Sequence, residues 1–464
     1  MMNTGGDFFA GHTHFVGIGG IGLSAMARVL LERGHQVSGS DLHLSPLTDE
    51  LRRLGATIYQ GHEASHVHGA DRLIVSSAIR PENPEVLAAR EMSIPVYKRD
   101  ETLPLLMQGQ FVIAVAGTHG KTTTAAMIAL ILAEAGFDPG FIVGGILRDL
   151  GTNGYAGGGR VFVVEADEYD RTFLGLKPDV AVVTGVEMDH PDCFRDLEEM
   201  AGAFADFLHL VPQHGLVVGC TDDPIVARLM SERRTTSAER QCYGFHCETG
   251  WSARSIVANE IGGANFTIRK GNEEIAQVQL QVPGRHNVLN ALAAWAVGER
   301  MGVPRAQMVA ALRRFSGVAR RFEEKGTVDG IVVVDDYAHH PTQIQATLAA
   351  ARARFPNRPI WAFFQPHTYS RTRALLPDFA ASFANADHVI VSAIFAAREP
   401  FDPTISGADL VAAIHHPDAR YIETLEGATE YLAAHLAPGD VLLTLGAGDG
   451  YRVGEELLKR LGAT

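Results

Sequence analysis

The chain has 464 residues, enough for about three domains that each bury a core of their own. Forty basic and fifty-four acidic side chains give a formal charge of −14, which argues against nucleic-acid binding. No apolar segment is long enough to span a bilayer, and the N-terminus lacks a signal-peptide pattern, so we expect a cytoplasmic protein without membrane insertion. Four cysteines without a C-x₂-C pair indicate neither a disulfide framework nor a zinc site.

The first recognisable pattern is a strand, a glycine loop and a helix near the N-terminus. Residues 14–16 are a predicted strand, residues 17–22 fit G-x-G-x-x-G, and a helix is expected from 24 to about 33. Such glycines let a diphosphate approach a helix N-terminus, and an acidic residue at the end of the next strand, here Asp41, binds ribose hydroxyls. The pattern does not specify the nucleotide, so NAD and a UDP-sugar both remain open.

A third strand is predicted at 72–76, and it ends in two serines, Ser76 and Ser77. Open α/β sheets bind ligands at the carboxyl ends of their strands, so these hydroxyls are candidate contacts, with a turn or helix cap as the alternative. Prolines punctuate the following segment. We expect the first domain boundary near residue 107.

The segment GTHGKTTT lies between an apolar run at 111–115 and an alanine-rich helical segment at 125–135. A lysine and a hydroxyl after a glycine, at a helix start, surround a triphosphate with N–H groups, a cation and an oxygen for Mg²⁺. Val115 stands where a standard P-loop has its first glycine, so the loop is a variant. The predicted ATP contacts here are Gly117, Thr118, His119, Gly120, Lys121, Thr122 and Thr123.

Acidic residues follow the next two predicted strands of this domain. The strand at 161–164 leads into Glu165-Ala166-Asp167-Glu168, and the strand at 180–184 leads to Glu187, Asp189 and His190. Carboxylates and an imidazole beside a P-loop hydroxyl suit a divalent cation that keeps several waters. The predicted metal-binding residues are Thr122, Glu165 and His190. The glycine-rich segment 144–159 is expected to be a loop, ordered on binding or running over the surface.

The remainder of this domain is predicted to be shorter strands, at 216–280, followed by a helix at 288–301. Polar residues, Arg285, His286 and Asn287, stand at the start of that helix. Asn offers a donor and an acceptor and can read an adenine edge, although capping is the other interpretation of Asn287.

A new alternation of strands and helices begins after Gly317. Four apolar strands, at 331–335, 359–364, 388–391 and 441–445, predict a Rossmann-like domain. Polar side chains stand just past the strand ends: Asp336, Tyr337, His339, His340, Gln365, His367, Arg371 and Asp449.

The predicted fold class is therefore α/β with three domains. Residues 1–106 form an N-terminal Rossmann-like domain, 107–316 a central P-loop ATPase-type domain, and 317–464 a C-terminal Rossmann-like domain. A triphosphate site, a site for a diphosphate-linked ribose and a third set of Arg and His side chains indicate a ligase. Such an enzyme moves the γ-phosphoryl group of ATP onto a carboxylate, and Lys121, Mg²⁺ and an Arg must neutralise the repulsion between the two anions.

The sequence resembles the Mur ligases of peptidoglycan synthesis over nearly its whole length. The motifs that carry the resemblance are HFVGIGGIGLSAMA from His14, SGSD from Ser38, VSSAI from Val75, AVAGTHGKTTT from Ala114, EADEYD from Glu165, PGRHNVLNALAA from Pro283, RRFE from Arg320, DDYAHHPT from Asp335, FQPHTYSRTR from Phe364 and LGAGD from Leu445.

The resemblance implies ATP and Mg²⁺ as cofactors, and UDP-N-acetylmuramate and L-alanine as the substrates of the alanine-adding branch of the family. It implies that a UDP-sugar contacts Gly17, Gly19, Gly20, Ile21, Gly22, Asp41, Ser76 and Ser77. ATP would contact His286, Asn287, Arg321 and Asp336 besides the P-loop. The amino acid would contact Tyr337, His367 and Arg371, and the implied catalytic residues are Lys121, His190, Arg321 and His339. A monomer or homodimer is expected.

Two departures from the family pattern bear on the branch. A stretch often seen as HRYTR is here His367-Thr368-Tyr369-Ser370-Arg371, which lacks one basic residue. No lysine occurs between Lys177 and Lys270, where several other members carry a carbamylated lysine, and this favours the alanine-adding branch. The alternatives are a relative that attaches a preformed peptide, an NAD-dependent dehydrogenase, and a nucleotide-switched binding protein.

Overall fold

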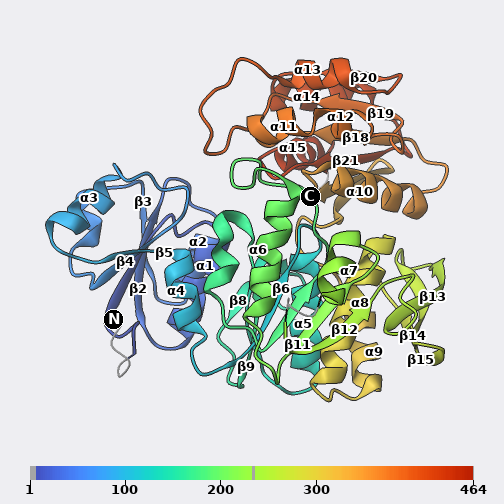
Figure 1. Ribbon diagram of the computed structural model, residues 1–464. Helices are drawn as coiled ribbons and strands as arrows, with labels where there is room; N and C mark the ends of the chain where they lie inside the picture. Colours follow the sequence, from blue (N-terminus) through green and yellow to red (C-terminus); the bar gives the residue numbers. More distant parts are fainter. Residues whose placement is uncertain (1–6, 233–235, 463–464) are drawn as a thin grey trace.

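The computed structural model describes residues 7–232 and 236–462 and consists of three α/β units that follow one another along the chain (Figure 1). Each unit is built around its own sheet, of five, ten and six strands. The prediction of an α/β protein with three domains is confirmed. Among the described residues, no helix combines the length and apolarity needed to cross a membrane.

The N-terminal unit is a fully parallel sheet in the order β3-β2-β1-β4-β5. Since β1 lies between β2 and β4, the connections reverse direction beside β1, and open α/β sheets bind ligands at such a point. The strands are β1 His12–Val16, β2 Gln36–Asp41, β3 Thr57–Gln60, β4 Arg72–Val75 and β5 Val96–Lys98. The helices are α1 Ile21–Glu32, α2 Pro46–Arg53, the 3-10 turn η1 Ala64–Val67, α3 Pro84–Glu91 and α4 Arg99–Leu106.

The central unit has the order β15-β14-β13-β12-β11-β10-β6-β9-β7-β8. Its inner strands pair in parallel, and antiparallel pairs close both ends. Its strands are β6 Phe111–Ala116, β7 Gly140–Leu147, β8 Thr152–Tyr155, β9 Val161–Glu165, β10 Val180–Val183, β11 Leu216–Cys220, β12 Glu239–Tyr243, β13 Trp251–Ala258, β14 Ala264–Lys270 and β15 Glu273–Gln279.

The helices of the central unit are α5 Lys121–Glu134, the 3-10 segment η2 Tyr169–Gly175, α6 Leu197–His209, α7 Pro224–Ser231, α8 Arg285–Arg300 and α9 Arg305–Arg314. Helix α5 is apolar on every side and almost wholly buried, because it packs between the sheet and α8. This packing fixes the helix that begins at Lys121.

The glycine-rich segment at 144–159 is not a loop, and that prediction was wrong. It contains the second half of β7 and all of β8, an antiparallel pair that packs against α1 of the N-terminal unit. The side-chain amide of Asn153 donates to the carbonyl of Ile21 at 2.6 Å and to the hydroxyl of Ser24 at 3.1 Å. A side chain at Gly154 would collide with Ala25, so the glycine allows the two units to approach closely.

The C-terminal unit has the order β16-β17-β21-β18-β19-β20. The four predicted apolar strands are present, and two further strands, β16 and β20, lie at the edges, where few residues are buried. The strands are β16 Glu323–Val328, β17 Ile331–Asp336, β18 Ile360–Phe364, β19 His388–Val391, β20 Ala419–Tyr421 and β21 Val441–Leu445. The helices are α10 Pro341–Arg354, α11 Tyr369–Ala374, α12 Leu376–Ala380, α13 Gly407–Ala413, α14 Leu425–His435 and α15 Tyr451–Arg460.

Candidate active site

All three units contribute to one cavity of about 270 Å³. Gly22 and Arg99 line it from the N-terminal unit, Lys121 and Glu168 from the central unit, and Arg371 from the C-terminal unit. The guanidinium of Arg99 occupies the space that a side chain at Gly22 would enter. The strand ends of three sheets therefore meet at one place.

The P-loop joins β6 to α5. Gly117 has a φ of 130°, and a side chain there would collide with Thr184, so only glycine fits. The hydroxyl of Thr118 accepts from the amide of Glu187 at 2.9 Å and donates to the Glu187 carbonyl at 3.1 Å, which holds the loop against the end of β10. Of the predicted ATP residues, Thr118, His119, Gly120, Lys121 and Thr122 line the cavity just described, and Thr123 lines a second one.

The buried carboxylate of Glu168 holds Lys121 in place. The sequence places Glu168 at this strand end but predicts no role for it. The Lys121 ammonium donates to the two carboxylate oxygens of Glu168, at 2.9 and 2.8 Å, and to the carbonyl of Gly117 at 2.6 Å. Burial raises the pKa of the Glu168 carboxyl to about 7, with Lys121 opposing this shift. Burial disfavours the charge on Lys121, but the surrounding carboxylates outweigh it and raise the pKa of the ammonium. Lys121 is thus a charged group aimed at the phosphate cradle.

The three predicted metal-binding residues, Thr122, Glu165 and His190, all line this cavity. One Glu165 oxygen accepts from the amide of Gly144 at 2.6 Å. Burial lowers the pKa of His190, so the imidazole is neutral at pH 7, and its Nε2 lies 3.7 Å from the Glu168 carboxylate. A hydroxyl, carboxylates and a neutral imidazole are a donor set that fits Mg²⁺.

A second cavity, of about 310 Å³, lies between α8 and the C-terminal unit and is lined by His286, Asn287, Arg321 and Asp336. Helix α8 starts at Arg285, three residues before the prediction, so Asn287 lies inside its first turn and is not its cap. Burial lowers the pKa of His286 to about 4, with a further contribution from Arg321. A neutral His286 imidazole at this place is compatible with contact to an uncharged purine ring.

Sequence reasoning missed Asn290, which also lines this second cavity. Its amide donates to the Asn287 side chain at 3.0 Å, and its oxygen accepts from Thr124 at 3.1 Å. The Asn287 amide in turn donates to the carbonyl of Pro283 at 2.6 Å. The two asparagines are three residues apart and therefore lie on one helix face, and this spacing is the signal by which Asn290 could have been found.

Arg321 lines both cavities, and its guanidinium lies over the ring of Tyr337 at 5.0 Å. Asp336 is buried and accepts backbone N–H groups from Phe322 at 2.7 Å and Ala338 at 2.8 Å. Burial raises the pKa of the Asp336 carboxyl above its usual value. Tyr337 and His339 line the first cavity, and burial holds the pKa of His339 well below its usual value.

The predicted amino-acid residues His367 and Arg371 line the first cavity and a third one of about 190 Å³. The buried Arg371 donates from Nε to Asp189 at 2.8 Å and from Nη1 to the carbonyl of His367 at 2.7 Å. Burial alone would raise the pKa of Asp189, but Arg371 outweighs it and holds that pKa well below the usual range. Arg371 is therefore already engaged with the central unit, and these two bonds use two of its five N–H groups.

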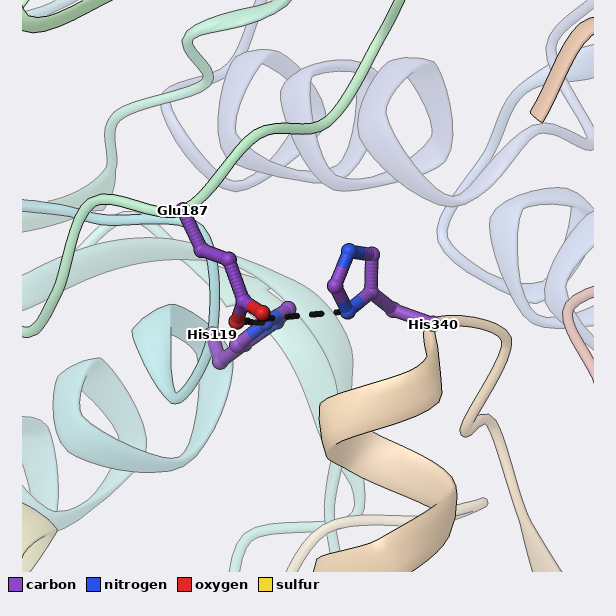
Figure 2. A group of neighbouring side chains, drawn as sticks. All are labelled: His119, Glu187 and His340. Carbon is purple, nitrogen blue, oxygen red and sulfur yellow. Dashed lines mark hydrogen bonds and ion pairs between the residues drawn. The ribbon is translucent and has the colours of Figure 1, made fainter. Parts of the chain in front are cut away.

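A further cluster joins the central and C-terminal units beside the P-loop (Figure 2). His119 Nε2 lies 2.9 Å from a Glu187 oxygen, and His340 Nδ1 lies 4.0 Å from the same carboxylate. The arrangement could hold a metal ion, but its groups already have partners: Gln343 reaches His119 Nδ1 at 2.9 Å, Thr342 donates to Glu187 at 2.6 Å, and His340 Nε2 reaches the Met188 carbonyl at 3.2 Å. We interpret it as a contact between the units, which the sequence did not predict.

The N-terminal glycine loop lies at the edge of the same region. Ile21 and Gly22 line the first cavity and Ser77 lines the third, whereas Gly17, Gly19, Gly20, Asp41 and Ser76 lie outside these cavities. Asp41 accepts from the amide of Gly19 at 2.9 Å and from that of His43 at 3.1 Å. It therefore holds the glycine loop in shape, a function beyond the predicted contact to ribose.

Comparison with protein families finds three successive domain models. Residues 12–111 match the catalytic domain of the Mur ligase family, 115–298 its middle domain, and 320–448 the domain described as "Mur ligase, glutamate ligase domain".

Similar curated proteins cover nearly the whole chain. A UDP-N-acetylmuramate–L-alanine ligase of Acidithiobacillus ferrooxidans is 47% identical over 441 residues, 94% of each chain. A protein of the same name from Desulfatibacillum aliphaticivorans is 44% identical over 451 residues, which is 96% of this chain and 97% of the relative.

Among solved structures, the UDP-N-acetylmuramate-alanine ligase of Thermotoga maritima has a TM-score of 0.81 at 30% identity and covers 97% of this chain and 99% of its own. A murein peptide ligase of Psychrobacter arcticus has a TM-score of 0.74 at 26% identity, with 98% and 99% coverage. The sheets, the P-loop variant, the family domains and these relatives agree, and the chain belongs to the Mur ligase family.

Proposed function

We propose that this protein is an ATP-dependent ligase that joins the carboxylate of UDP-N-acetylmuramate to the amine of L-alanine, with release of ADP and phosphate. The observation that carries the proposal is the single cavity to which all three units contribute. Arg99 lies on its N-terminal side, Lys121 in its P-loop and Arg371 on its C-terminal side. Two relatives named for this reaction share 47% and 44% identity with nearly the whole chain.

In the first step, a carboxylate oxygen of the sugar attacks the γ-phosphorus of ATP, the bond to the β-phosphate oxygen breaks, and ADP leaves. Two anions must meet, and Lys121 and Arg321 supply positive charge on the cavity wall. The second cavity, with the neutral His286 and the Asn287–Asn290 pair, supports assignment to the nucleoside. Ile21, Gly22 and Ser77 would face the UDP-sugar.

In the second step, the amine of alanine attacks the acyl carbon, and phosphate leaves. The amine must lose a proton, and a neutral imidazole is a suitable acceptor. His339 lines the cavity, and burial holds its pKa well below the usual value. We assign the third cavity, with His367 and Arg371, to the amino acid, because it is small and holds a guanidinium for the carboxylate.

Mg²⁺ fits the donor set of Thr122, Glu165 and His190, and Glu168 lies next to it. When bound, Mg²⁺ would neutralise phosphate charge and polarise the transferred group. The surplus of carboxylates over cations at this edge supports a cation there: among the described residues, the cations paired with Glu165, Asp167 and Glu168 are Lys121 and the more distant Arg99, 3.9 Å from Asp167.

The test is ADP release by the full-length enzyme with ATP, Mg²⁺ and UDP-N-acetylmuramate, against a panel of single amino acids and a preformed tripeptide. We expect L-alanine to give the highest kcat/KM and a product heavier than the sugar by one alanyl residue in mass spectrometry. A tripeptide that outcompetes every amino acid would instead assign the peptide-adding reaction, and absence of ADP release with all acceptors would contradict a ligase.

Three further features stay proposals. We infer domain limits of 1–106, 107–316 and 317–464, because α4 ends at Leu106 and α9 ends at Arg314. The cytoplasmic location and a monomeric or homodimeric state rest on sequence reasoning alone.

A further inference from the structure

Two of the four cysteines lie against each other at the end of β12, outside the residues that line the three cavities described above. Cys242 belongs to β12, and Cys247 lies in the turn that leads to β13. Their sulfur atoms are 2.7 Å apart, and both are free thiols. The other two, Cys193 and Cys220, lie in different parts of the central unit.

The turn between the two cysteines is held in place on several sides. Asp222 accepts the backbone amides of Phe245 at 2.6 Å and His246 at 3.0 Å. The guanidinium of Arg285 lies 4.6 Å from the ring of Phe245, and Arg254 donates to the Phe245 carbonyl at 2.7 Å. The sulfur atoms are thus brought together by the turn itself. A disulfide bond is about 2.0 Å long, so the sulfurs need to approach by roughly 0.7 Å.

The two thiols are arranged as an attacking and a resolving group. Cys242 is partly exposed, whereas Cys247 is buried. The Cys247 thiol donates to the Cys242 sulfur, and the Thr249 hydroxyl lies 3.5 Å from that sulfur. These hydrogen bonds, chiefly the one from Cys247, lower the pKa of Cys242, and thiolate character makes a cysteine nucleophilic. Burial raises the pKa of Cys193 and Cys220, which keeps both as thiols.

We propose that Cys242 and Cys247 are a site of reversible oxidation, at which a hydroperoxide converts the thiol pair into an intramolecular disulfide while Cys193 and Cys220 stay reduced.

The chemistry balances with one peroxide per pair. The Cys242 thiolate attacks one peroxide oxygen, the O–O bond breaks, and water leaves after protonation, which produces a sulfenic acid on Cys242. The Cys247 sulfur then attacks the Cys242 sulfur, the S–O bond breaks, and the second water leaves with the proton of Cys247. Two thiols are oxidised, one hydrogen peroxide is reduced to two waters, and a dithiol reductant reverses the reaction.

The experiment exposes the full-length protein to a small excess of hydrogen peroxide, then denatures it and alkylates it with iodoacetamide. The chain has four cysteines, so the reduced protein takes up four alkyl groups. We expect two after oxidation, four again after dithiothreitol, and a peptide map that links Cys242 to Cys247. Four alkyl groups after oxidation, or a linkage that includes Cys193 or Cys220, would overturn the proposal.

Two variants test the assigned roles. In Cys247→Ser the resolving thiol is gone, so a cyclic dione that traps sulfenic acids should label Cys242. In the matched control Cys193→Ser, the number of alkyl groups taken up per chain should fall from three to one on oxidation, just as it falls from four to two in the parent. A Cys242→Ser variant that still loses two thiols would contradict the pairing, and it should fold because serine is close to cysteine in size at this partly exposed position.

Discussion

Two buried carboxylates of the central unit differ in how their charge is balanced. Glu168 follows β9 and Asp189 follows β10, the two strands that flank β6, and they are 1% and 3% exposed. Each lies 2.8 Å from a cation, Lys121 and Arg371. Nevertheless, burial raises the pKa of Glu168 to about 7, whereas the pKa of Asp189 lies well below its usual range because Arg371 outweighs burial.

The difference lies in the surroundings of each ion pair. Glu168 shares its lysine with Asp167 and Glu165, so the end of β9 carries a surplus of negative charge that a bound cation would balance. Asp189 pairs with Arg371, which belongs to another domain. The end of β9 therefore keeps negative charge in excess, whereas the end of β10 serves the contact with the C-terminal unit.

The largest effect is expected from Lys121→Ala, which removes the cation at the end of β9. One charge contact to a transition state is worth about 10² to 10³ in rate, so kcat for ADP release should fall by about that factor. The fold should persist, because Glu168, with a pKa of about 7, can take up a proton. Lys177→Ala, at an exposed position, is the matched control and should turn over normally. Near-normal kcat in Lys121→Ala would contradict the assignment of the phosphate site.

Arg371→Lys tests the cation at the end of β10, because lysine keeps the positive charge but lacks the planar guanidinium with its several N–H donors. A hydrogen bond to a charged group is worth about 1.5–3 kcal/mol, so kcat/KM should fall by about 10- to 100-fold. The KM for L-alanine should rise more than those for ATP and the UDP-sugar if Arg371 also contacts the amino acid. Equal increases for all three substrates would indicate that Arg371 serves only the domain contact. Arg373→Lys, half-exposed two residues away, is the control.

The charge of a third buried carboxylate, Glu85, is balanced by partners inside the N-terminal unit. The pH dependence of stability tests this third case. Glu85 contacts His66 at 2.8 Å, Ser40 at 2.6 Å, His62 at 3.5 Å and His14 at 3.6 Å. Burial alone would raise the pKa of Glu85, but these partners lower it from 4.5 to about 2.

Because the pKa of Glu85 is lower in the folded state, its contribution is present above about pH 4.5 and is lost as the pH falls towards 2. Burial lowers the pKa of His14, whose contribution is likewise lost as the pH falls below 6.5. We expect Glu85→Gln to lose on the order of 2 kcal/mol of stability at pH 7 and to show a flatter decline in melting temperature below pH 4.5. The exposed Glu82→Gln is the control, and equal acid slopes in both variants would refute this reading.

The smallest effect is expected at the contact between the units beside the P-loop. Thr342→Val removes the hydroxyl that donates to Glu187 at 2.6 Å without changing the shape of the side chain. Because Thr342 is exposed, water can replace its hydroxyl at the Glu187 carboxylate, so the loss should be only about 1 kcal/mol and kcat/KM should fall a few-fold, while the melting temperature stays close to that of the parent. Thr327→Val, on an exposed position of β16, should change neither. A change in melting temperature without a change in rate would assign the contact to stability alone.

The sequence by itself determined the three α/β units, the P-loop and the strand ends that bear polar residues. These features are local: apolar runs form buried strands, glycines allow the turns, and parallel strands bring their carboxyl ends to one edge. Short or charged edge strands such as β16 and β20 escaped prediction, because an edge strand needs no apolar run.

Only the tertiary structure decided which partner each polar group finds. Arg371 and Asp189 are 182 residues apart, and His119 and Gln343 are 224 apart. No local pattern specifies such pairs, because they form where two domains pack together. The glycines of 144–159 show the same limit. Their composition is that of a loop, yet β8 pairs with β7 and both strands pack against α1 of another unit, and this tertiary context makes the segment part of a hairpin.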